Sequence, residues 1–162
     1  MKVILHDLDH TYDDFVASRC DRVIAADGKY APCQGCFGCW TKHPAECFMK
    51  DKLQQVCRVI GQTDELVVIT SNLYGSYSVA VKNVLDRSIG TSTPFSTYRG
   101  KQMHHTLRYG THDLWKVIVY GDITEAERDT FRYTAERNAL NDGFARSEVV
   151  FIQSLDELEG LL

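Results

Sequence analysis

Four cysteines lie within one short segment of the chain, and their spacing is suited to binding an inorganic cofactor. The segment reads P-C-Q-G-C-F-G-C-W-T-K-H-P-A-E-C-F-M, and two, two and seven residues separate its successive cysteines, which are Cys33, Cys36, Cys39 and Cys47. Such spacing, with glycines among the first three thiols, recurs in proteins that hold a [4Fe-4S] cluster. The segment is equally compatible with reduced, metal-free thiols that close a surface loop, so both interpretations stay open at this point.

Zinc and disulfide bonds fit these cysteines less well. A zinc ribbon would need two C-x-x-C pairs held well apart by a connecting segment. Disulfides are typical of secreted proteins, and the opening residues M-K-V-I-L-H-D form too short an apolar run for a secretory signal. We therefore expect a cytoplasmic protein whose cysteines are reduced.

The composition of the chain indicates one domain spanning residues 1–162. Hydrophobic residues make up 44% of it and charged residues 25%, which is enough apolar material for a full core. The formal net charge is -4 and no Lys/Arg cluster alternates with aromatic residues, which argues against nucleic-acid binding. The longest apolar runs are of strand length, far below the roughly 20 residues that span a bilayer, so no membrane insertion is expected.

A second candidate site follows the apolar run that ends near Thr70. The sequence T-S-N-L-Y-G-S-Y-S, residues 70–78, combines small polar side chains, a glycine and two tyrosines. In open α/β sheets, ligands bind beyond the carboxyl ends of the strands, and the rings of Tyr74 and Tyr77 would suit a flat heterocyclic ligand. The alternative is an ordinary connection from strand to helix whose tyrosines pack on the protein itself.

Short β-branched runs alternate with helical patterns along the chain, which is typical of a parallel sheet covered by helices. The expected strands are residues 2–6, 22–25, 65–70, 115–120 and 148–152. A helix is expected over residues 51–60, and capping boxes at Thr124 and Ser154 predict two further helix starts. Residues 90–110, with His104 and His105, are less regular and are expected to form a long functional loop with room for a short strand.

Taken together, the motifs resemble the flavodoxin-like NADPH-dependent FMN reductase and iron-sulfur flavoprotein superfamily. The similarity rests on P-C-Q-G-C-F-G-C-W, P-A-E-C-F-M-K-D, S-N-L-Y-G-S-Y-S and V-K-N-V-L-D-R, from about residue 32 to residue 87. It resumes more weakly at M-H-H-T-L-R-Y and Y-G-D-I-T-E-A-E-R. Each motif alone is weak, whereas the combination is specific.

The resemblance implies an α/β fold, a flavodoxin-like three-layer sandwich whose five parallel strands have the order 2-1-3-4-5. It also implies FMN at the carboxyl ends of the strands, and nicotinamide nucleotides or a protein as electron partners. The residues that would hold the flavin ring are Ser71, Asn72, Leu73, Tyr74, Gly75 and Ser76. In the iron-sulfur branch, the thiolates of Cys33, Cys36, Cys39 and Cys47 would ligate a [4Fe-4S] cluster.

The family resemblance also bears on assembly, because the flavin ring in this superfamily lies partly at a subunit contact. We therefore expect a homo-oligomer, most simply a closed dimer or a tetramer. Phe95, Tyr98 and Met103, in the irregular region before residue 110, would contribute to that contact.

The segment after the first strand departs from the family pattern. Where the family has a Gly/Ser/Thr/Arg loop whose amides receive the FMN phosphate, this chain has H-D-L-D-H-T-Y-D-D, residues 6–14. The carboxylates of Asp7, Asp9, Asp13 and Asp14 would repel a phosphate. The stretch is also short for a helix that connects two parallel strands. We predict a shortened first crossover and a phosphate site that is missing or rebuilt.

Two functions are consistent with these features. The first is an FMN-dependent NAD(P)H oxidoreductase or electron-transfer flavoprotein, with or without a [4Fe-4S] cluster in the cysteine segment. The second is a non-catalytic flavodoxin-like electron-transfer or interaction module that lacks a competent FMN phosphate site. The sequence assigns no catalytic residue in either case.

Overall fold

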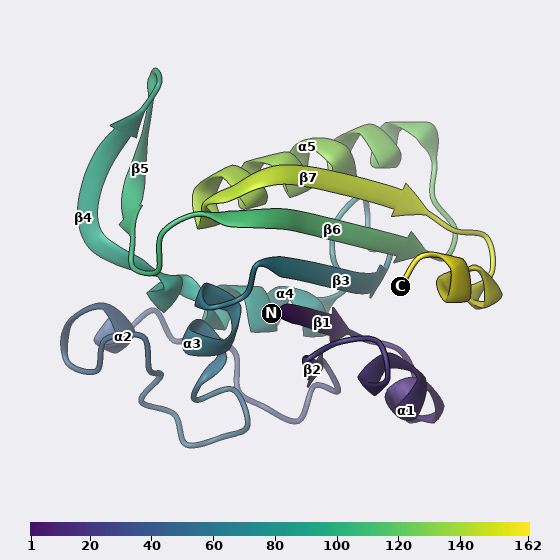
Figure 1. Ribbon diagram of the computed structural model, residues 1–162, viewed down its shortest axis with the longest axis horizontal. Helices are drawn as coiled ribbons and strands as arrows, with labels where there is room; N and C mark the ends of the chain where they lie inside the picture. Colours follow the sequence, from purple (N-terminus) through teal and green to yellow (C-terminus); the bar gives the residue numbers. More distant parts are fainter.

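Five parallel strands form the central sheet of the computed structural model, which describes residues 1–162 (Figure 1). They are β1 (Lys2–His6), β2 (Arg22–Ala25), β3 (Glu65–Ser71), β6 (His112–Tyr120) and β7 (Phe144–Phe151). Their order across the sheet is β2-β1-β3-β6-β7, which is 2-1-3-4-5 when only the strands of this sheet are counted. The α/β class and the parallel sheet predicted from the sequence are confirmed.

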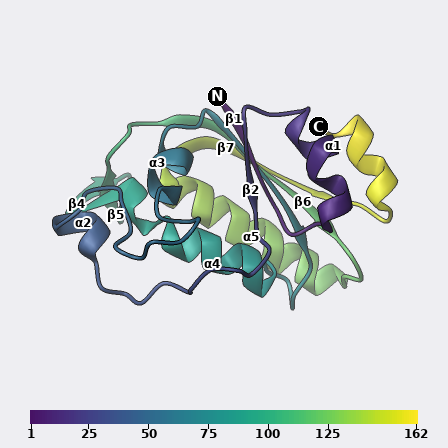
Figure 2. The same cartoon turned by 90° about the horizontal axis from the view of Figure 1, so that it is seen from below.

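Helices cover both faces of the sheet and make it the middle of three layers (Figure 2). Successive side chains of a strand point to opposite faces. Val3 and Leu5 therefore pack in one apolar cluster with the helical layer of α3 (Val56–Gly61), α4 (Val79–Arg87) and α5 (Glu125–Asp142). Ile4 belongs to a second cluster under α1 (Asp13–Ala17) and the 3-10 helix η3 (Leu155–Gly160). No helix is long and apolar enough to cross a membrane.

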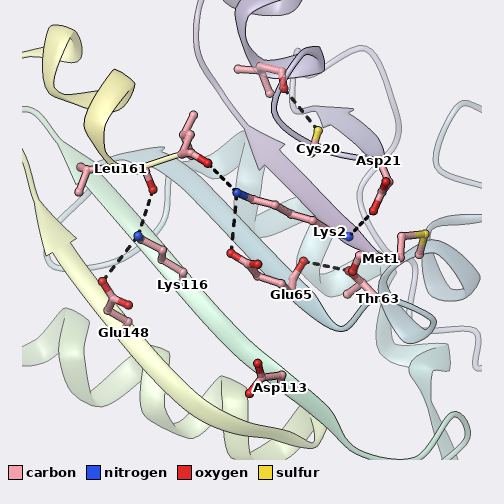
Figure 3. A network of polar contacts seen from close by, with 12 residues as sticks. Met1, Lys2, Cys20, Asp21, Thr63, Glu65, Asp113, Lys116, Glu148 and Leu161 are labelled. Atoms are coloured by element: carbon pink, nitrogen blue, oxygen red, sulfur yellow. Dashed lines mark hydrogen bonds and ion pairs between the residues drawn. The ribbon is translucent and has the colours of Figure 1, made fainter.

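The last residues of the chain are fixed on the second face by two lysines of the sheet (Figure 3). Lys2 of β1 donates from Nζ to the carbonyl of Leu162 at 2.9 Å, and Lys116 of β6 donates to the carbonyl of Leu161 at 3.1 Å. Each lysine also lies near a glutamate of a neighbouring strand. These contacts hold η3 against the sheet although the helix is short.

The first crossover is short, as predicted. Between β1 and β2 the chain forms only the 3-10 turn η1 (His10–Tyr12) and the five-residue helix α1. The acidic residues act locally here: the Asp9 carboxylate accepts a hydrogen bond from the amide of Thr11 at 3.0 Å and caps η1. Asp13 and Asp14 lie in the first turn of α1, where a negative charge favours the helix dipole.

The second crossover differs from the expectation of a helix over residues 51–60. Residues before Val56 form turns, and α3 covers only Val56–Gly61. Asp51 does not start a helix, because its carboxylate accepts from the amide of Leu53 and pairs with Arg87 instead. The cysteine segment contains one further helix, the four-residue α2 (Gly38–Thr41).

Both predicted capping boxes are confirmed. Thr124 and Glu127 exchange hydrogen bonds at the start of α5, which then runs for 18 residues. Ser154 and Glu157 form the same arrangement, but the helix that follows is the 3-10 helix η3.

Residues 90–110 are more regular than predicted. After the 3-10 turn η2 (Ile89–Thr91) the chain forms an antiparallel hairpin of β4 (Ser92–Arg99) and β5 (Gln102–Leu107). Figure 1 shows it projecting from the end of the sheet where the parallel strands begin. Phe95, Tyr98 and Met103 are each more than 60% exposed on it. The prediction of a long loop is therefore wrong.

Candidate functional site

The residues expected to hold a flavin ring form a tight turn at the carboxyl end of β3, which we call the β3 turn (residues 71–76). The amide of Leu73 donates to the carbonyl of Ser76 at 2.9 Å, and the amide of Ser76 donates back at 3.1 Å. The two residues between them, Tyr74 and Gly75, both have positive φ, 53° and 76°. This is the conformation of a two-residue hairpin turn in which both central residues are left-handed.

The Asn72 side chain hydrogen-bonds both within the β3 turn and to the loop after β6. Its Oδ1 accepts from the amide of Gly75 at 3.0 Å, and its Nδ2 donates to the carbonyl of Asp122 at 2.8 Å. The turn is therefore linked to the loop after β6 as well as closed on itself. A Cβ atom at Gly75 would lie 3.0 Å from the carbonyl oxygen and 3.1 Å from the Cα of Glu127, so α5 packs closely against the turn on its other side.

The two tyrosines of this region have different environments. Tyr74 is 85% exposed, whereas Tyr77 is buried. The Tyr77 ring packs edge-on against Phe131, and its hydroxyl accepts from Asn138. The prediction that both rings could stack on a flat ligand is therefore wrong for Tyr77, and Tyr74 alone offers a free ring face.

Most side-chain hydroxyls near the turn are used within the protein. Thr70 is buried and its Oγ1 accepts from the amide of Ser78 at 3.0 Å. Ser78 in turn caps α4 by accepting from the amide of Val81. The backbone amides of Tyr74 and Tyr77, by contrast, donate to no other group of the chain. Because Tyr77 is buried, the amide and the ring of Tyr74 are the groups that the region offers to a ligand.

The carboxylate of Asp7 occupies the position between the ends of β1, β3 and β6. It accepts from the amide of Ser71 at 3.1 Å, from the Ser71 hydroxyl at 3.0 Å and from the Tyr120 hydroxyl at 3.0 Å. Burial and this neighbouring charge raise the pKa of Tyr120. An anion of the chain itself therefore already fills the donor set at the strand ends.

Sequence reasoning recognised the acidic loop but missed this arrangement. It predicted repulsion of a phosphate by four carboxylates, and it gave Ser71 to the flavin rather than to Asp7. The missed signal was Tyr120, whose hydroxyl stands at the carboxyl end of the neighbouring strand and completes the donor set.

The four cysteines of the cysteine segment (residues 32–50) line a common cavity. Its volume is about 100 Å³, and its wall also includes Phe37, Phe48, Met49 and Arg87. We call it the Cys cavity. Cys33 and Cys36 are exposed, Cys39 is buried and Cys47 lies between these extremes. The structure therefore brings the four predicted ligands to one place.

The thiols do not converge on a single point. No three His, Cys, Asp or Glu side chains of the chain lie close enough to hold one metal ion. A polynuclear cluster is wider than one ion, and its ligating thiolates stand farther apart, so a shared cavity rather than a tight cage is what it requires. The donor set is all thiol, which is the set that such clusters use.

Cys39 and Cys57 form a close pair behind the cavity. Cys57 is fully buried, and its thiol donates to the carbonyl of Arg87 at 3.2 Å. Hydrogen bonding with Cys57 lowers the pKa of Cys39, and the same contact raises the pKa of Cys57. A side chain at Gly90 would collide with both, at 2.9 Å from the Cys57 sulfur. The sixth cysteine, Cys20, is half-buried and donates to the carbonyl of Val16 at 3.4 Å.

Trp40 anchors the cysteine segment to the rest of the fold. Its Nε1 donates to the carbonyl of Ile89 at 2.8 Å, and its ring packs 4.6 Å from the ring of His105. Because β5 carries His104 and His105, both lie on the hairpin at the end of the sheet opposite the strand arrowheads in Figure 1. These histidines are therefore at the opposite end of the sheet from the β3 turn (Figure 1).

The largest cavity of the chain, about 490 Å³, is separate from both sites. It runs along the edge strand β2 and the segment from Lys52 to Val59. Neither the β3 turn nor any of the four cysteines contributes to its wall.

Comparison with solved structures gives the fold a precedent. An NADPH-quinone reductase from P. pentosaceus superposes with a TM-score of 0.52 and 14% sequence identity, over 99% of this chain and 90% of that chain. The chain has a flavodoxin-like fold. A flavodiiron core from Synechocystis matches more loosely, with a TM-score of 0.42 and 10% identity over 96% of this chain and 31% of that one. No protein-family model and no curated protein matches the sequence.

Proposed function

We propose that the protein is an FMN-dependent oxidoreductase or electron-transfer flavoprotein that takes electrons from NAD(P)H and carries a [4Fe-4S] cluster in the Cys cavity. The observation that carries the proposal is the β3 turn: a closed turn at the carboxyl end of a central strand, with an exposed Tyr74 ring, in a fold shared with an NADPH-quinone reductase. Ligands of open α/β sheets bind at such strand ends.

The flavin would be held mainly through its ring. The free amide of Tyr74 would donate to a ring heteroatom, and the Tyr74 ring would stack on the ring face. Ser71, Asn72, Leu73, Gly75 and Ser76 would shape the turn that presents these groups. When bound, FMN supplies the redox chemistry, while the protein binds and orients it.

The phosphate of FMN would find no preformed cradle at the usual place. Asp7 already accepts from both donors of Ser71 and from Tyr120. The α1 helix that would offer its amino end has only five residues. We therefore expect FMN and riboflavin to bind with affinities within about tenfold of each other, a difference of less than ~1.4 kcal/mol.

The Cys cavity would hold the cluster through Cys33, Cys36, Cys39 and Cys47. A cluster supplies one-electron transfer, which would connect the flavin to a protein electron partner. The cavity lies at the far end of α4 from the β3 turn, since Ser78 caps the first turn of that helix and Arg87, its last residue, lines the cavity. Nine helical residues span about 13 Å.

Assembly into a homodimer or a tetramer is part of the proposal. A hairpin of two strands is marginal by itself, and this one exposes Phe95, Tyr98 and Met103. A second copy packed on the hairpin would bury these side chains. Sedimentation of the wild type and of a Tyr98→Ser/Met103→Ser variant at micromolar concentration measures this: an oligomer that dissociates in the variant is expected, and a monomeric wild type would contradict it.

The flavin part of the proposal is tested by the visible spectrum of protein purified without oxygen, before and after FMN is added. Retained or regained flavin absorbance that is bleached by NADPH supports the oxidoreductase. Iron and sulfide analysis of the same sample tests the cluster.

The alternative remains a non-catalytic flavodoxin-like electron-transfer or interaction module. The observation that favours it is the Asp7 carboxylate, which fills the strand-end donor set with the chain's own charge. A protein that binds neither FMN nor riboflavin in the same titration would support this alternative.

A further inference from the structure

Arg87 is a buried cation in the wall of the Cys cavity. Its side chain has no exposed area. Nη1 and Nη2 each donate to an oxygen of Asp51 at 2.8 Å, and Nη1 also donates to the carbonyl of Ala31 at 2.8 Å. The Nε–H, however, has no partner in the chain. A guanidinium keeps its proton in proteins, so a full positive charge with an unpaired Nε–H lies beside four thiols.

Asp51, the counter-ion of Arg87, lies outside the wall of the Cys cavity. Its side chain is 22% exposed. Its carboxylate also accepts hydrogen bonds from the backbone amides of Leu53 and Ala31. Asp51 raises the pKa of Arg87, and the nearby Cys47 raises it further. The cavity therefore meets the positive member of the ion pair more directly than the negative one.

A positive charge at this position has a specific consequence for the proposed cofactor. The reduction potential of an iron-sulfur cluster depends on its net charge, on hydrogen bonds to its sulfurs and on its exposure. A cation in a water-poor wall favours the reduced state, which carries one more negative charge, and so raises the potential.

We infer that Arg87 is the charge-compensating residue of the cluster, and that Asp51 sets how much of its charge the cluster meets. This inference rests on the proposed cluster. Arg87 acts through the cluster's potential and is not a ligand.

A purely structural role makes a different prediction. The Arg87–Asp51 pair also fastens both ends of the cysteine segment to α4, because Ala31 precedes Cys33 and Asp51 follows Cys47. If that were the whole role, every variant of the pair would lower cluster occupancy. The potential of the clusters that remain would not move in opposite directions.

The experiment is an anaerobic redox titration of the full chain, followed by visible absorbance and electron paramagnetic resonance, with iron and sulfide measured on each sample. Asp51→Asn leaves the Arg87 charge unbalanced and should raise the midpoint potential. Arg87→Gln combined with Asp51→Asn removes both charges and should lower it below the wild type. Arg87→Lys keeps the charge and should stay nearest to the wild type.

A control pair lies on the same helix. Lys82 and Asp86 are 52% and 44% exposed, so Lys82→Gln combined with Asp86→Asn changes charges that solvent screens and should leave the potential unchanged.

Opposite shifts in the two Asp51 variants, with the control unmoved, support the inference. Iron-loaded protein in which both variants shift the same way, or in which neither moves more than the control, overturns it and leaves the cluster standing. If the double variant loses its iron, the Asp51→Asn variant tests the inference by itself. A raised midpoint potential supports the inference, and a lowered or unchanged one overturns it. A wild type without iron overturns the cluster and this inference together.

Discussion

The two candidate sites stand at opposite ends of α4 and are built in different ways. The β3 turn is closed by its own hydrogen bonds, is supported by Asn72, and already has an anion, Asp7, at its base. The cysteine segment has only the four-residue helix α2 as regular structure, and its fixed points are Trp40 and the Arg87–Asp51 pair. One site is preformed, whereas the other surrounds a cavity that a cofactor would complete.

This difference indicates where each site draws its stability. A preformed turn keeps its shape without a ligand, so changing it should alter ligand affinity more than folding. A segment wrapped around a cavity gains stability from what binds there, because a ligand that binds only the folded state stabilises it. Loss of a cofactor should therefore reduce the stability of the cysteine segment much more than that of the β3 turn.

The largest expected effect is the loss of the cluster from a Cys36→Ser variant. Cys36 lines the cavity and is exposed, so its replacement removes a proposed ligand without disturbing the core. A missing thiolate leaves one iron unligated. Anaerobic iron and sulfide analysis should show iron in the wild type and almost none in the variant. Cys20→Ser, outside the cavity, is the control and should keep the wild-type iron content.

If the wild type contains no iron when purified without oxygen, the metal-free thiols considered from the sequence are the correct interpretation. Aerobic preparations do not test the point, because thiolates and exposed clusters are oxidised.

Two glycines allow the comparison to be tested on stability. Gly90→Ala places a methyl group 2.9 Å from the Cys57 sulfur and 3.0 Å from Cβ of Cys39, and overpacking of this kind costs about 1–3 kcal/mol. Gly75→Ala strains a φ of 76° and presses on α5. Denaturant unfolding should show a lower free energy of unfolding for both variants, but only Gly90→Ala should also reduce iron binding. A loss of iron in Gly75→Ala would contradict the separation of the two sites.

The sheet could be predicted from the sequence because its strands are nearly continuous apolar runs bounded by polar residues. The first two strands were placed to the residue, and both capping boxes were found where hydroxyl and carboxylate stand three residues apart. β6 and β7 begin three and four residues earlier than predicted, since polar residues such as Asp113 and Arg146 interrupt the apolar runs there, although Phe144 itself is buried in the core. The hairpin over residues 92–107 could not be predicted for the same reason, because a polar, exposed hairpin has no apolar pattern that would indicate it.

The segments that form the candidate sites could be predicted from the sequence, but the burial and the long-range partners of their residues could not. The spacing of the cysteines was visible, whereas the buried partner Arg87 lies 40 residues beyond Cys47 and reads as an ordinary helix residue. Tyr74 and Tyr77 are three residues apart and chemically identical, yet the tight turn exposes one and buries the other. Long-range contacts of this kind are set by the packing of the whole sheet and helix layer.

A smaller effect is expected at Asp7. Asp7→Asn removes the negative charge at the base of the β3 turn while leaving an acceptor for Ser71. The repulsion between this charge and a phosphate near it is worth about 1 kcal/mol in water, or roughly fivefold in affinity. FMN should therefore bind tighter by about that factor, and riboflavin should be unchanged. Asp14→Asn, at an exposed position of α1, is the control. Equal changes for both ligands would show that Asp7 acts on the shape of the turn rather than through its charge.

The most local effect, similar in size to that at Asp7, should come from the ring of Tyr74. Its side chain is 85% exposed and packs on nothing that would be lost, so Tyr74→Ala should leave stability nearly unchanged. The loss of an aromatic contact should weaken flavin binding by ~0.5 to 1.5 kcal/mol. Because the ring is common to both ligands, FMN and riboflavin should weaken together, and Tyr74→Phe should restore both. Fluorescence titration measures the affinity of each protein for both ligands, with Tyr133→Ala, at an exposed tyrosine of α5, as the matched control. Weakening of FMN alone would mean that Tyr74 meets the phosphate end of the ligand, and the ring-centred site proposed for the β3 turn would be wrong.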